Sequence, residues 1–288
     1  MWKEVLSSFF YIALELTVLF ILITFLVSVV QMIIPYHKME KWMNHPNVWL
    51  GSFLAVLFAF ITPFCSCSTI PVVVTLLQKK VPFGIVMVFL FASPVLDPTI
   101  LTIMTAFLGW KVALFYTIIT TTLSVVIGLT LGKLGFEKQV KNVILKSYNP
   151  ENKGFSIKQA VSETLVLMKT VYPYLIIGAA IGAIIHGAVP TSFITQYFGG
   201  DNWWLVPIAA IIGIPLYIRL STMIPISQMM IAKGMALGPV MALVISSAGA
   251  SLPELALLNS IFKKKLVAAF VISVISMSTV SGFLFYLV

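Results

Sequence analysis

The chain has 288 residues, of which 60% are hydrophobic and only 9% are charged. A soluble core of this size cannot hide so much apolar surface, so the composition excludes a soluble globular protein and predicts an all-α protein that crosses the membrane several times. The net charge of +9 does not indicate a nucleic-acid partner, because the lysines stand in short connections between apolar runs, as they do in cytoplasmic loops of membrane proteins.

The apolar runs define the expected elements in chain order. They cover about residues 5–35, 48–78, 83–108, 110–132, 164–189, 203–232, 237–260 and 266–288. A spanning helix needs about 20 residues, so 48–78 and 203–232 are too long for one straight crossing. We therefore expect broken or re-entrant helices inside these two runs, at 62–71 and at 215–225.

Both breaks are bracketed by prolines, which remove a backbone donor and clash with a continuing helix. Pro63 and Pro71 enclose the first break, and Pro215 and Pro225 enclose the second. Irregular backbone at membrane depth survives only where it is buried in protein or lines a cavity. Each break therefore marks a candidate binding site.

The two halves of the chain align with a shift of 154–155 residues. Matching pairs include Pro35 with Pro190, Ile70-Pro71 with Ile224-Pro225, Gly84 with Gly238, and Lys111-Val112-Ala113 with Lys265-Leu266-Val267. We expect two homologous four-segment membrane repeats, 1–132 and 161–288, joined by a polar cytoplasmic linker, 133–160. Such repeats are typical of transporters, whose substrate site lies between the repeats near the midplane.

The lysines suggest how the repeats are oriented. If 48–78 enters and leaves on one side, each repeat crosses an odd number of times and the second is inverted. Lys79-Lys80, the linker and Lys263–Lys265 then all face the cytoplasm, as the positive-inside bias favours. The alternative is that every run crosses, which makes the repeats parallel and turns Lys263–Lys265 outward.

The first break contains both cysteines of the chain, in Cys65-Ser66-Cys67-Ser68. In an extended segment, residues two apart point the same way, so both sulfur atoms can converge on one soft atom such as Cu(I), zinc or trivalent arsenic. The alternative is that these cysteines are small buried apolar residues. No histidine cluster accompanies them, so we expect neither a resident metal nor a cofactor.

Three charged residues stand at or near the other breaks. Arg219 falls on Cys65 at a shift of 154, and an arginine at the bilayer centre needs a partner or a cavity. Asp97 and Glu254 are candidates for proton or ion coupling, or for neutralising Arg219. The alternative is that both acids cap helices.

Prolines and small residues surround the two acids, which indicates helix ends at membrane depth. Pro94 and Pro98 flank Asp97, and Pro253 precedes Glu254. An acid just before a proline suits the first turn of a new helix. We therefore expect helix breaks at these prolines as well.

Several of these motifs resemble the predicted-permease family of the YraQ and ArsP type. The motifs are Thr62-Pro63-Phe64-Cys65-Ser66-Cys67-Ser68, Pro82-Phe83-Gly84 and Ala92-Ser93-Pro94-Val95-Leu96-Asp97-Pro98. Some members of that family export trivalent organoarsenicals, so the resemblance implies that Cys65 and Cys67 bind substrate. We expect many arsenical-type members to carry a cysteine after Pro-Leu-Tyr; here Ile218-Arg219 follows, which favours the YraQ-like branch and fits a small anion as well.

The sequence thus predicts a multi-pass permease of the inner membrane, not an enzyme. Its partners are the lipid bilayer and a small thiophilic or anionic solute, without nucleic acid, and the chain is compatible with an oligomer. Cys65, Ser66, Cys67, Ser68 and Arg219 are the expected substrate ligands. The alternative is an intramembrane thiol enzyme in which the cysteine pair passes electrons or sulfur. A channel fits less well, since no polar ring is repeated.

Overall fold

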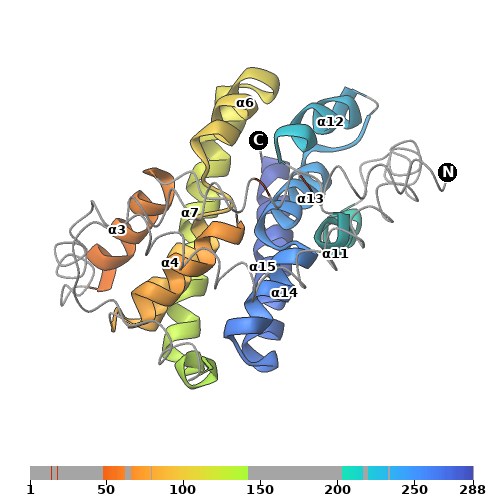
Figure 1. The fold of residues 1–288 in the computed structure, drawn as a ribbon. Helices are drawn as coiled ribbons and strands as arrows, with labels where there is room; N and C mark the ends of the chain where they lie inside the picture. The colour runs from red at the N-terminus through yellow and green to blue at the C-terminus, as the bar shows by residue number, and fades with distance from the viewer. Residues whose placement is uncertain are drawn as a thin grey trace.

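The computed structural model describes residues 48–61, 66–78, 80–141, 203–216, 220–232 and 234–287, with Leu14 and Val18. These residues form ten α-helices and no β-strand, which confirms the all-α class (Figure 1). The first half contains α3 (Val48–Ile61), α4 (Ser66–Gln78), α5 (Phe83–Ala92), α6 (Pro98–Leu108), α7 (Trp110–Lys133) and the short 3-10 helix η1 (Phe136–Gln139). The second half contains α11 (Leu205–Leu216), α12 (Leu220–Ala232), α13 (Leu237–Gly249), α14 (Leu252–Ile261), α15 (Lys264–Leu284) and the 3-10 helix η2 (Phe285–Leu287).

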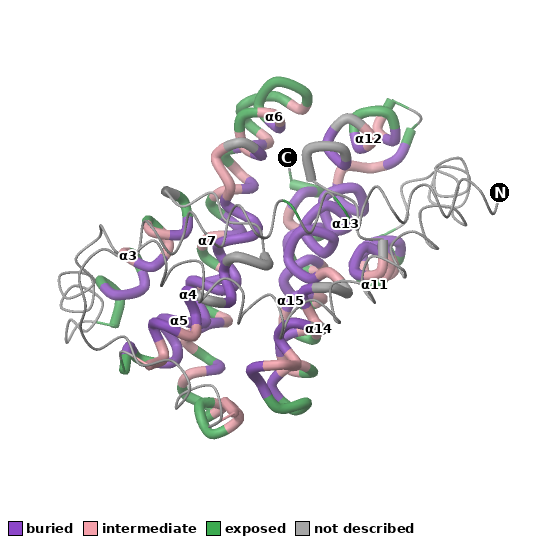
Figure 2. The backbone as a smooth tube through the Cα atoms, viewed as in Figure 1, coloured by how far each residue is buried: buried purple, intermediate pink, exposed green. Residues whose placement is uncertain are grey.

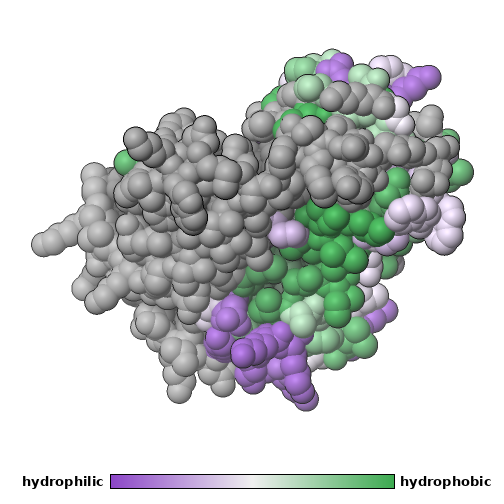
Figure 3. All heavy atoms as spheres, turned by 90° about the vertical axis from the view of Figure 1, so that its right-hand side faces the viewer, coloured by the Kyte–Doolittle hydropathy of each residue, from purple (hydrophilic) through white to green (hydrophobic). Residues whose placement is uncertain are grey.

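Two of the described helices are long and apolar enough to cross a membrane: α7, and α15 together with η2. Only 33% and 39% of the residues in their apolar windows are buried inside the protein. A core helix of a soluble protein would be mostly buried, so these exposed apolar faces fit contact with lipid. Figure 3 shows apolar side chains gathered between hydrophilic groups at the two ends.

The long helices α7 and α15 lie side by side and run in opposite directions (Figure 1). At one end the rings of Phe115 and Phe285 meet edge to face, with centroids 5.2 Å apart. At the other end the chain after α7 pairs with the chain before α15 through an antiparallel bridge between Val140 and Phe262. The contacts at both ends require an antiparallel pair.

The bridged end collects lysines from both halves, and we call it the lysine end. The ammonium group of Lys141 donates to the carbonyl oxygen of Asn259 at 2.6 Å, and that of Lys263 donates to the carbonyl oxygen of Lys138 at 3.3 Å. Lys264 begins α15 at the same end. Segments that are more than a hundred residues apart in sequence therefore carry their positive charges together.

Helices α5 and α13 are the most buried elements, as Figure 2 shows. Each packs closely on the long helix of its own half through glycines. A Cβ atom placed on Gly128 of α7 would lie 2.6 Å from the backbone nitrogen of Val88, and one placed on Gly132 would lie 2.8 Å from the Cα of Gly84. In the other half, a Cβ on Gly238 would lie 2.7 Å from the carbonyl oxygen of Gly282.

The helices of the two halves begin at a constant interval. Four helices of the first half begin at 66, 83, 98 and 110, and four of the second begin at 220, 237, 252 and 264, each 154 residues later. We call helices and residues related by this interval counterparts.

The ends of α4 and α12 also correspond. After α4 the backbone N–H of Lys80 donates to Leu77 and that of Val81 donates to Leu76, each at 3.1 Å. Lys80 has a φ of 58°, and its counterpart Gly234 has a φ of 92°. This is the Schellman type of helix ending, in which one residue adopts the left-handed conformation.

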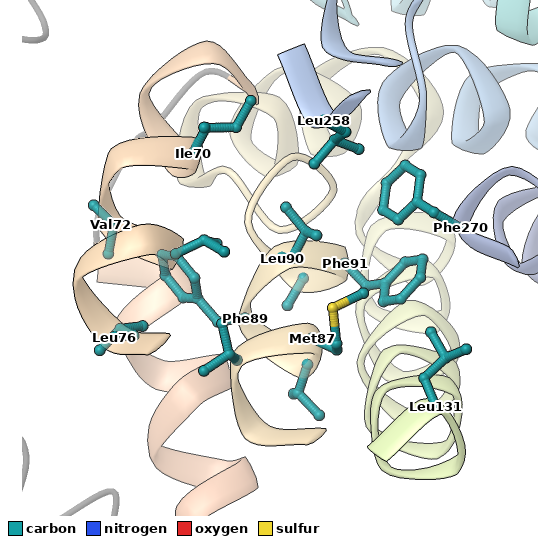
Figure 4. Close-up of a cluster of buried hydrophobic side chains, with 14 of the residues drawn as sticks. Ile70, Val72, Leu76, Met87, Phe89, Leu90, Phe91, Leu131, Leu258 and Phe270 are labelled. Atoms are coloured by element: carbon teal, nitrogen blue, oxygen red, sulfur yellow. The ribbon is translucent and has the colours of Figure 1, made fainter. Parts of the chain in front are cut away.

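Besides the counterpart pair α7 and α15, two contacts between the halves pair a helix with one that is not its counterpart. Helix α4 packs against α14, and α12 packs against α6. Figure 4 shows Ile70 of α4 facing Leu258 of α14 in a buried apolar cluster. In the same cluster the rings of Phe91 and Phe270 stack with centroids 4.8 Å apart.

Described helices cover part of both ranges in which breaks were expected, 62–71 and 215–225. Helix α4 begins at Ser66 and contains Pro71, and α12 begins at Leu220 and contains Pro225. Pro215 lies one residue before the end of α11. Pro71 and Pro225 are each the sixth residue of their helix, so each removes one helical hydrogen bond, the one to the carbonyl group four residues earlier. Pro63 lies outside the described residues.

Candidate functional site

The interruptions between α5 and α6 and between α13 and α14 meet inside the protein. Helix α5 ends at Ala92 and α13 ends at Gly249. A Cβ placed on Gly249 would lie 3.9 Å from a methyl group of Val95, so the two interruptions are in van der Waals range. At this contact between the halves, helical hydrogen bonding is therefore interrupted on both sides.

Side chains from two other helices hold the first interruption. The hydroxyl groups of Thr69 on α4 and Ser93 are 3.1 Å apart and buried. The hydroxyl group of Tyr116 on α7 donates to the carbonyl oxygen of Val95 at 3.0 Å. A buried carbonyl that has lost its helical donor needs such a partner, because leaving it unpaired costs about 1–3 kcal/mol. Sequence reasoning did not single out Thr69, Ser93 or Tyr116 for this role, and only their hydroxyl groups within apolar runs signalled it.

Two of the three prolines predicted at these interruptions stand at helix starts. Pro94 is buried in the turn after α5, and Pro98 is the first residue of α6. Pro253 is the second residue of α14. Proline suits the first turn of a helix because its fixed φ matches the helix and its missing N–H would have no partner there.

The two acids occupy different positions relative to their helices. Asp97 directly precedes α6, is half-buried, and accepts a hydrogen bond from the backbone N–H of Leu101 through its carbonyl oxygen at 3.1 Å. Its counterpart by the constant interval is Ser251, whose hydroxyl accepts from the backbone N–H of Glu254 at 3.4 Å. Glu254 is the third residue of α14 and is only 1% exposed. The serine, not the glutamate, therefore caps α14.

The predicted substrate ligands lie at the starts of two counterpart helices. Ser66, Cys67 and Ser68 are the first three residues of α4, and the structure describes their backbone alone. Cys65 directly precedes α4 and Arg219 directly precedes α12, and both lie outside the described residues. The structure therefore gives the backbone position of this motif but no side-chain geometry for it.

Helix starts dominate the electrostatics of this region. Helices α6 and α14 begin at the two interruptions and contact α12 and α4, whose preceding residues lie outside the described part of the chain. The starts of α6 and α14 carry backbone N–H groups without a helical partner and the positive end of the helix dipole, which favour an anion. Pro71 and Pro225 have no N–H to offer the carbonyl groups four residues earlier, so acceptors are also available. Among the described residues, no group of three or more His, Cys, Asp and Glu side chains forms a metal site.

Comparison with known proteins identifies relatives over nearly the whole chain. A family model described as a predicted permease matches residues 1–287. The chain is 25% identical to the UPF0718 protein YraQ of Escherichia coli, over 83% of this chain and 68% of that protein. It is 27% identical to the UPF0718 protein YcgR of Bacillus subtilis, over 91% and 90%, and 23% identical to a putative two-component membrane permease complex subunit of Streptococcus mutans, over 85% and 79%. No solved structure shows a significant match.

Proposed function

The chain belongs to the predicted-permease family, and on that basis we propose that it is a multi-pass secondary transporter of the inner membrane that moves a small thiophilic or anionic solute. Family membership favours a transporter over the thiol enzyme that the cysteine pair alone would also allow. The proposal needs a solute site between two parts of the protein that can move against each other.

One observation carries the proposal: interrupted helices from the two halves begin at a constant interval of 154 residues and contact each other in crossed pairs. This arrangement supports two inverted repeats, 1–132 and 161–288, joined by the linker 133–160. Inverted repeats with interrupted helices near the midplane are a recurring design of secondary transporters. The antiparallel direction of α7 and α15 supports inversion over parallel repeats.

The lysine end supports the sidedness that the sequence suggested. Lys80 and Lys133 line one hollow, and Lys263 is tied to the chain after α7. The start of α3 lines that hollow together with the end of α4, which supports a re-entrant hairpin formed by α3 and α4. By the positive-inside bias, this end faces the cytoplasm.

In the proposed site, the solute binds at the starts of α4 and α12. Cys65 and Cys67 supply thiolates for a soft centre such as trivalent arsenic. Arg219 and the two helix starts supply positive charge for an anionic group. Buried Glu254 and half-buried Asp97 stand at the starts of α14 and α6, the helices that pack on α4 and α12, so either can couple transport to a proton or ion.

Flux measurements in proteoliposomes test this proposal and separate the two solute classes. We expect Cys65→Ser/Cys67→Ser to abolish uptake or export of phenylarsine oxide, a trivalent organoarsenical, if thiolates bind the solute. We expect Arg219→Gln to abolish movement of sulfite if the solute is a small anion. Ser260→Ala, on the far part of α14, serves as the control variant. Flux of neither compound by the wild-type protein, or flux that both variants preserve, would contradict the proposed site.

The topology has its own test, because Cys65→Ser/Cys67→Ser removes both cysteines of the chain. Single cysteines are then placed at Lys80, Lys264 and Lys111 and labelled in intact cells with a membrane-impermeant maleimide. We expect only the cysteine at Lys111 to react from outside. Labelling of Lys264→Cys from outside would favour parallel repeats.

A further inference from the structure

A hollow of about 930 Å³ opens at the lysine end of the first half. It lies between the start of α3, the turn that joins α4 to α5, and the last turns of α7. Its lining includes Trp49, Leu77, Lys80, Leu129, Lys133 and Glu137. The lining therefore combines apolar side chains with two ammonium groups and one carboxylate, at the start of α5, whereas the first interruption follows the end of that helix.

Lys80 occupies a backbone position that disfavours a lysine. Its φ of 58° lies in the left-handed region, where glycine is free of steric cost and a residue with a Cβ pays about 1–2 kcal/mol. The counterpart, Gly234, uses glycine for the same helix ending. A non-glycine residue held in a strained conformation indicates that its side chain serves a purpose other than stability.

The counterpart place in the second half is filled by an aromatic side chain. There the ring of Tyr286 packs against Gly238, so closely that a Cβ on this glycine would lie 2.6 Å from the ring. Tyr286 is the counterpart of Gly132, and Leu287 is the counterpart of Lys133. Neither lysine of the hollow is repeated, so the site is a departure from the correspondence between the halves.

We propose that this hollow binds an anionic phospholipid. The phosphate group lies between the ammonium groups of Lys80 and Lys133, and an acyl chain lies along Leu77, Leu129 and the indole of Trp49. Trp49 is 73% exposed, as a side chain at the membrane interface is. Basic pockets between membrane helices are suited to anionic headgroups, and the apolar lining gives a lipid an advantage over a free anion. Glu137 opposes the two lysines, and the three charges together leave a net charge of +1.

The test uses the purified full chain in neutral detergent, with dioleoylphosphatidylglycerol as the anionic probe and dioleoylphosphatidylcholine as the neutral one. Lipid retention is measured by native mass spectrometry, and the lipid-induced rise of the melting temperature is measured in parallel. We expect wild-type protein to retain phosphatidylglycerol and to melt at a higher temperature with it than with phosphatidylcholine. Equal effects of the two lipids would overturn the proposal.

The decisive variants replace the lysines by their counterparts, as Lys80→Gly and Lys133→Leu. Glycine fits the φ of residue 80 without strain, so Lys80→Gly without lipid should melt at or above the wild-type temperature. Each variant should bind phosphatidylglycerol about 5-fold more weakly and the double variant about 30-fold more weakly, since each lysine near a charged lipid surface contributes about one such factor. Unchanged binding by the double variant would overturn the proposal.

Control variants separate this site from general attraction of lipid to the charged end. Lys265→Gln removes a lysine at the start of α15 that does not line the hollow, and Lys111→Gln removes one at the start of α7. Both should retain wild-type binding. An equal loss of lipid binding with Lys265→Gln would overturn the proposal in favour of diffuse electrostatics. Displacement of the lipid by inorganic phosphate at equal concentration would overturn it in favour of a free anion, and displacement by an acidic peptide would overturn it in favour of a protein partner.

Discussion

The two described halves use the same helix starts but fill equivalent positions with different residues. In the first half, α4 begins with Cys67 in its first turn, Tyr116 bonds to the adjacent interruption, and Lys80 ends the helix in a strained conformation. In the second half, the counterparts of these three residues are Ser221, Phe270 and Gly234. The shared backbone therefore shows what the architecture requires, and the unshared side chains indicate where each half has a separate task.

The largest expected effect concerns the glycines that allow the buried helices α5 and α13 to pack closely on α7 and α15. Gly128→Ala places a methyl group 2.6 Å from the backbone nitrogen of Val88, which cannot turn away. We expect it to lower the free energy of unfolding by about 3 kcal/mol, at the upper end for overpacked cores. Its counterpart, Gly282→Ala, meets a side-chain methyl group of Val206 at 2.6 Å but a backbone atom, the carbonyl oxygen of Gly238, only at 2.9 Å, so it should cost somewhat less. Unfolding in detergent by heat and by denaturant measures both.

The matched control for this pair is Gly84→Ala. Its new methyl group would lie no closer than 3.4 Å to any neighbour, which is ordinary contact. It should leave the melting temperature within about 2 °C of the wild type. If Gly84→Ala is as damaging as Gly128→Ala, the close approach of α5 and α7 is not the cause.

The next effect concerns the two acids. Glu254 is 1% exposed whereas Asp97 is half-buried, so neutralising Glu254 changes a group that solvent does not screen. We expect Glu254→Gln to slow gradient-driven flux at least about tenfold, equivalent to about 1.4 kcal/mol of barrier, and Asp97→Asn to slow it less. Transport under an imposed pH gradient, compared with solute exchange without one, measures this difference. Equal losses in gradient-driven flux and in exchange would mean that Glu254 does not act in coupling.

A smaller effect is expected from a substitution that gives the first half the residue type of the second. Tyr116→Phe removes the donor to the carbonyl oxygen of Val95 and installs the residue type of its counterpart, Phe270. We expect a loss of about 1 kcal/mol in the free energy of unfolding, because a buried acceptor loses its partner. Faster amide exchange near Leu96 should accompany it. An unchanged melting temperature would show that the interruption does not depend on this bond.

The smallest effect is the bond between Thr69 and Ser93. A double-mutant cycle with Thr69→Val and Ser93→Ala should give a coupling of about 0.6 kcal/mol, the average for polar contacts in membrane proteins. The counterparts, Met223 and Ser247, form no equivalent pair, since the hydroxyl of Ser247 donates to the carbonyl oxygen of Val244. A cycle with Met223→Leu and Ser247→Ala should therefore show no coupling, and equal coupling in both halves would contradict this reading.

Much of the fold could be predicted because the position and length of an apolar run indicate where a membrane helix lies. The predicted run 110–132 and the observed α7 differ by one residue, and the run 83–108 covers α5 and α6 together. The start of α6 was visible in the sequence, because proline suits a first helical turn and disfavours the turn before it. The resemblance to a permease family is likewise confirmed along the chain.

Other features depended on contacts that no local pattern encodes. Pro71 and Pro225 suggested wider breaks, but each lies inside a helix, since near a helix start one lost hydrogen bond is tolerated. Asp97 and Glu254 both stand beside a proline in the sequence, but the counterpart of Asp97 is Ser251, which caps α14. The left-handed conformation of Lys80 could not be anticipated at all, as lysine rarely adopts it.

The backbone pairing that joins the chain after α7 to the chain before α15 has a mechanical consequence. The backbone N–H of Lys141 donates to the carbonyl oxygen of Ile261 at 3.0 Å, and that of Lys263 donates to the carbonyl oxygen of Gln139 at 2.9 Å. The two segments are therefore hydrogen-bonded as two neighbouring strands would be. At the far end the rings of Phe115 on α7 and Phe285 on η2 meet edge to face, a contact that can slide. A rotation of one half against the other would therefore have its hinge at the lysine end, and the displacement would be largest on the opposite side of the bilayer.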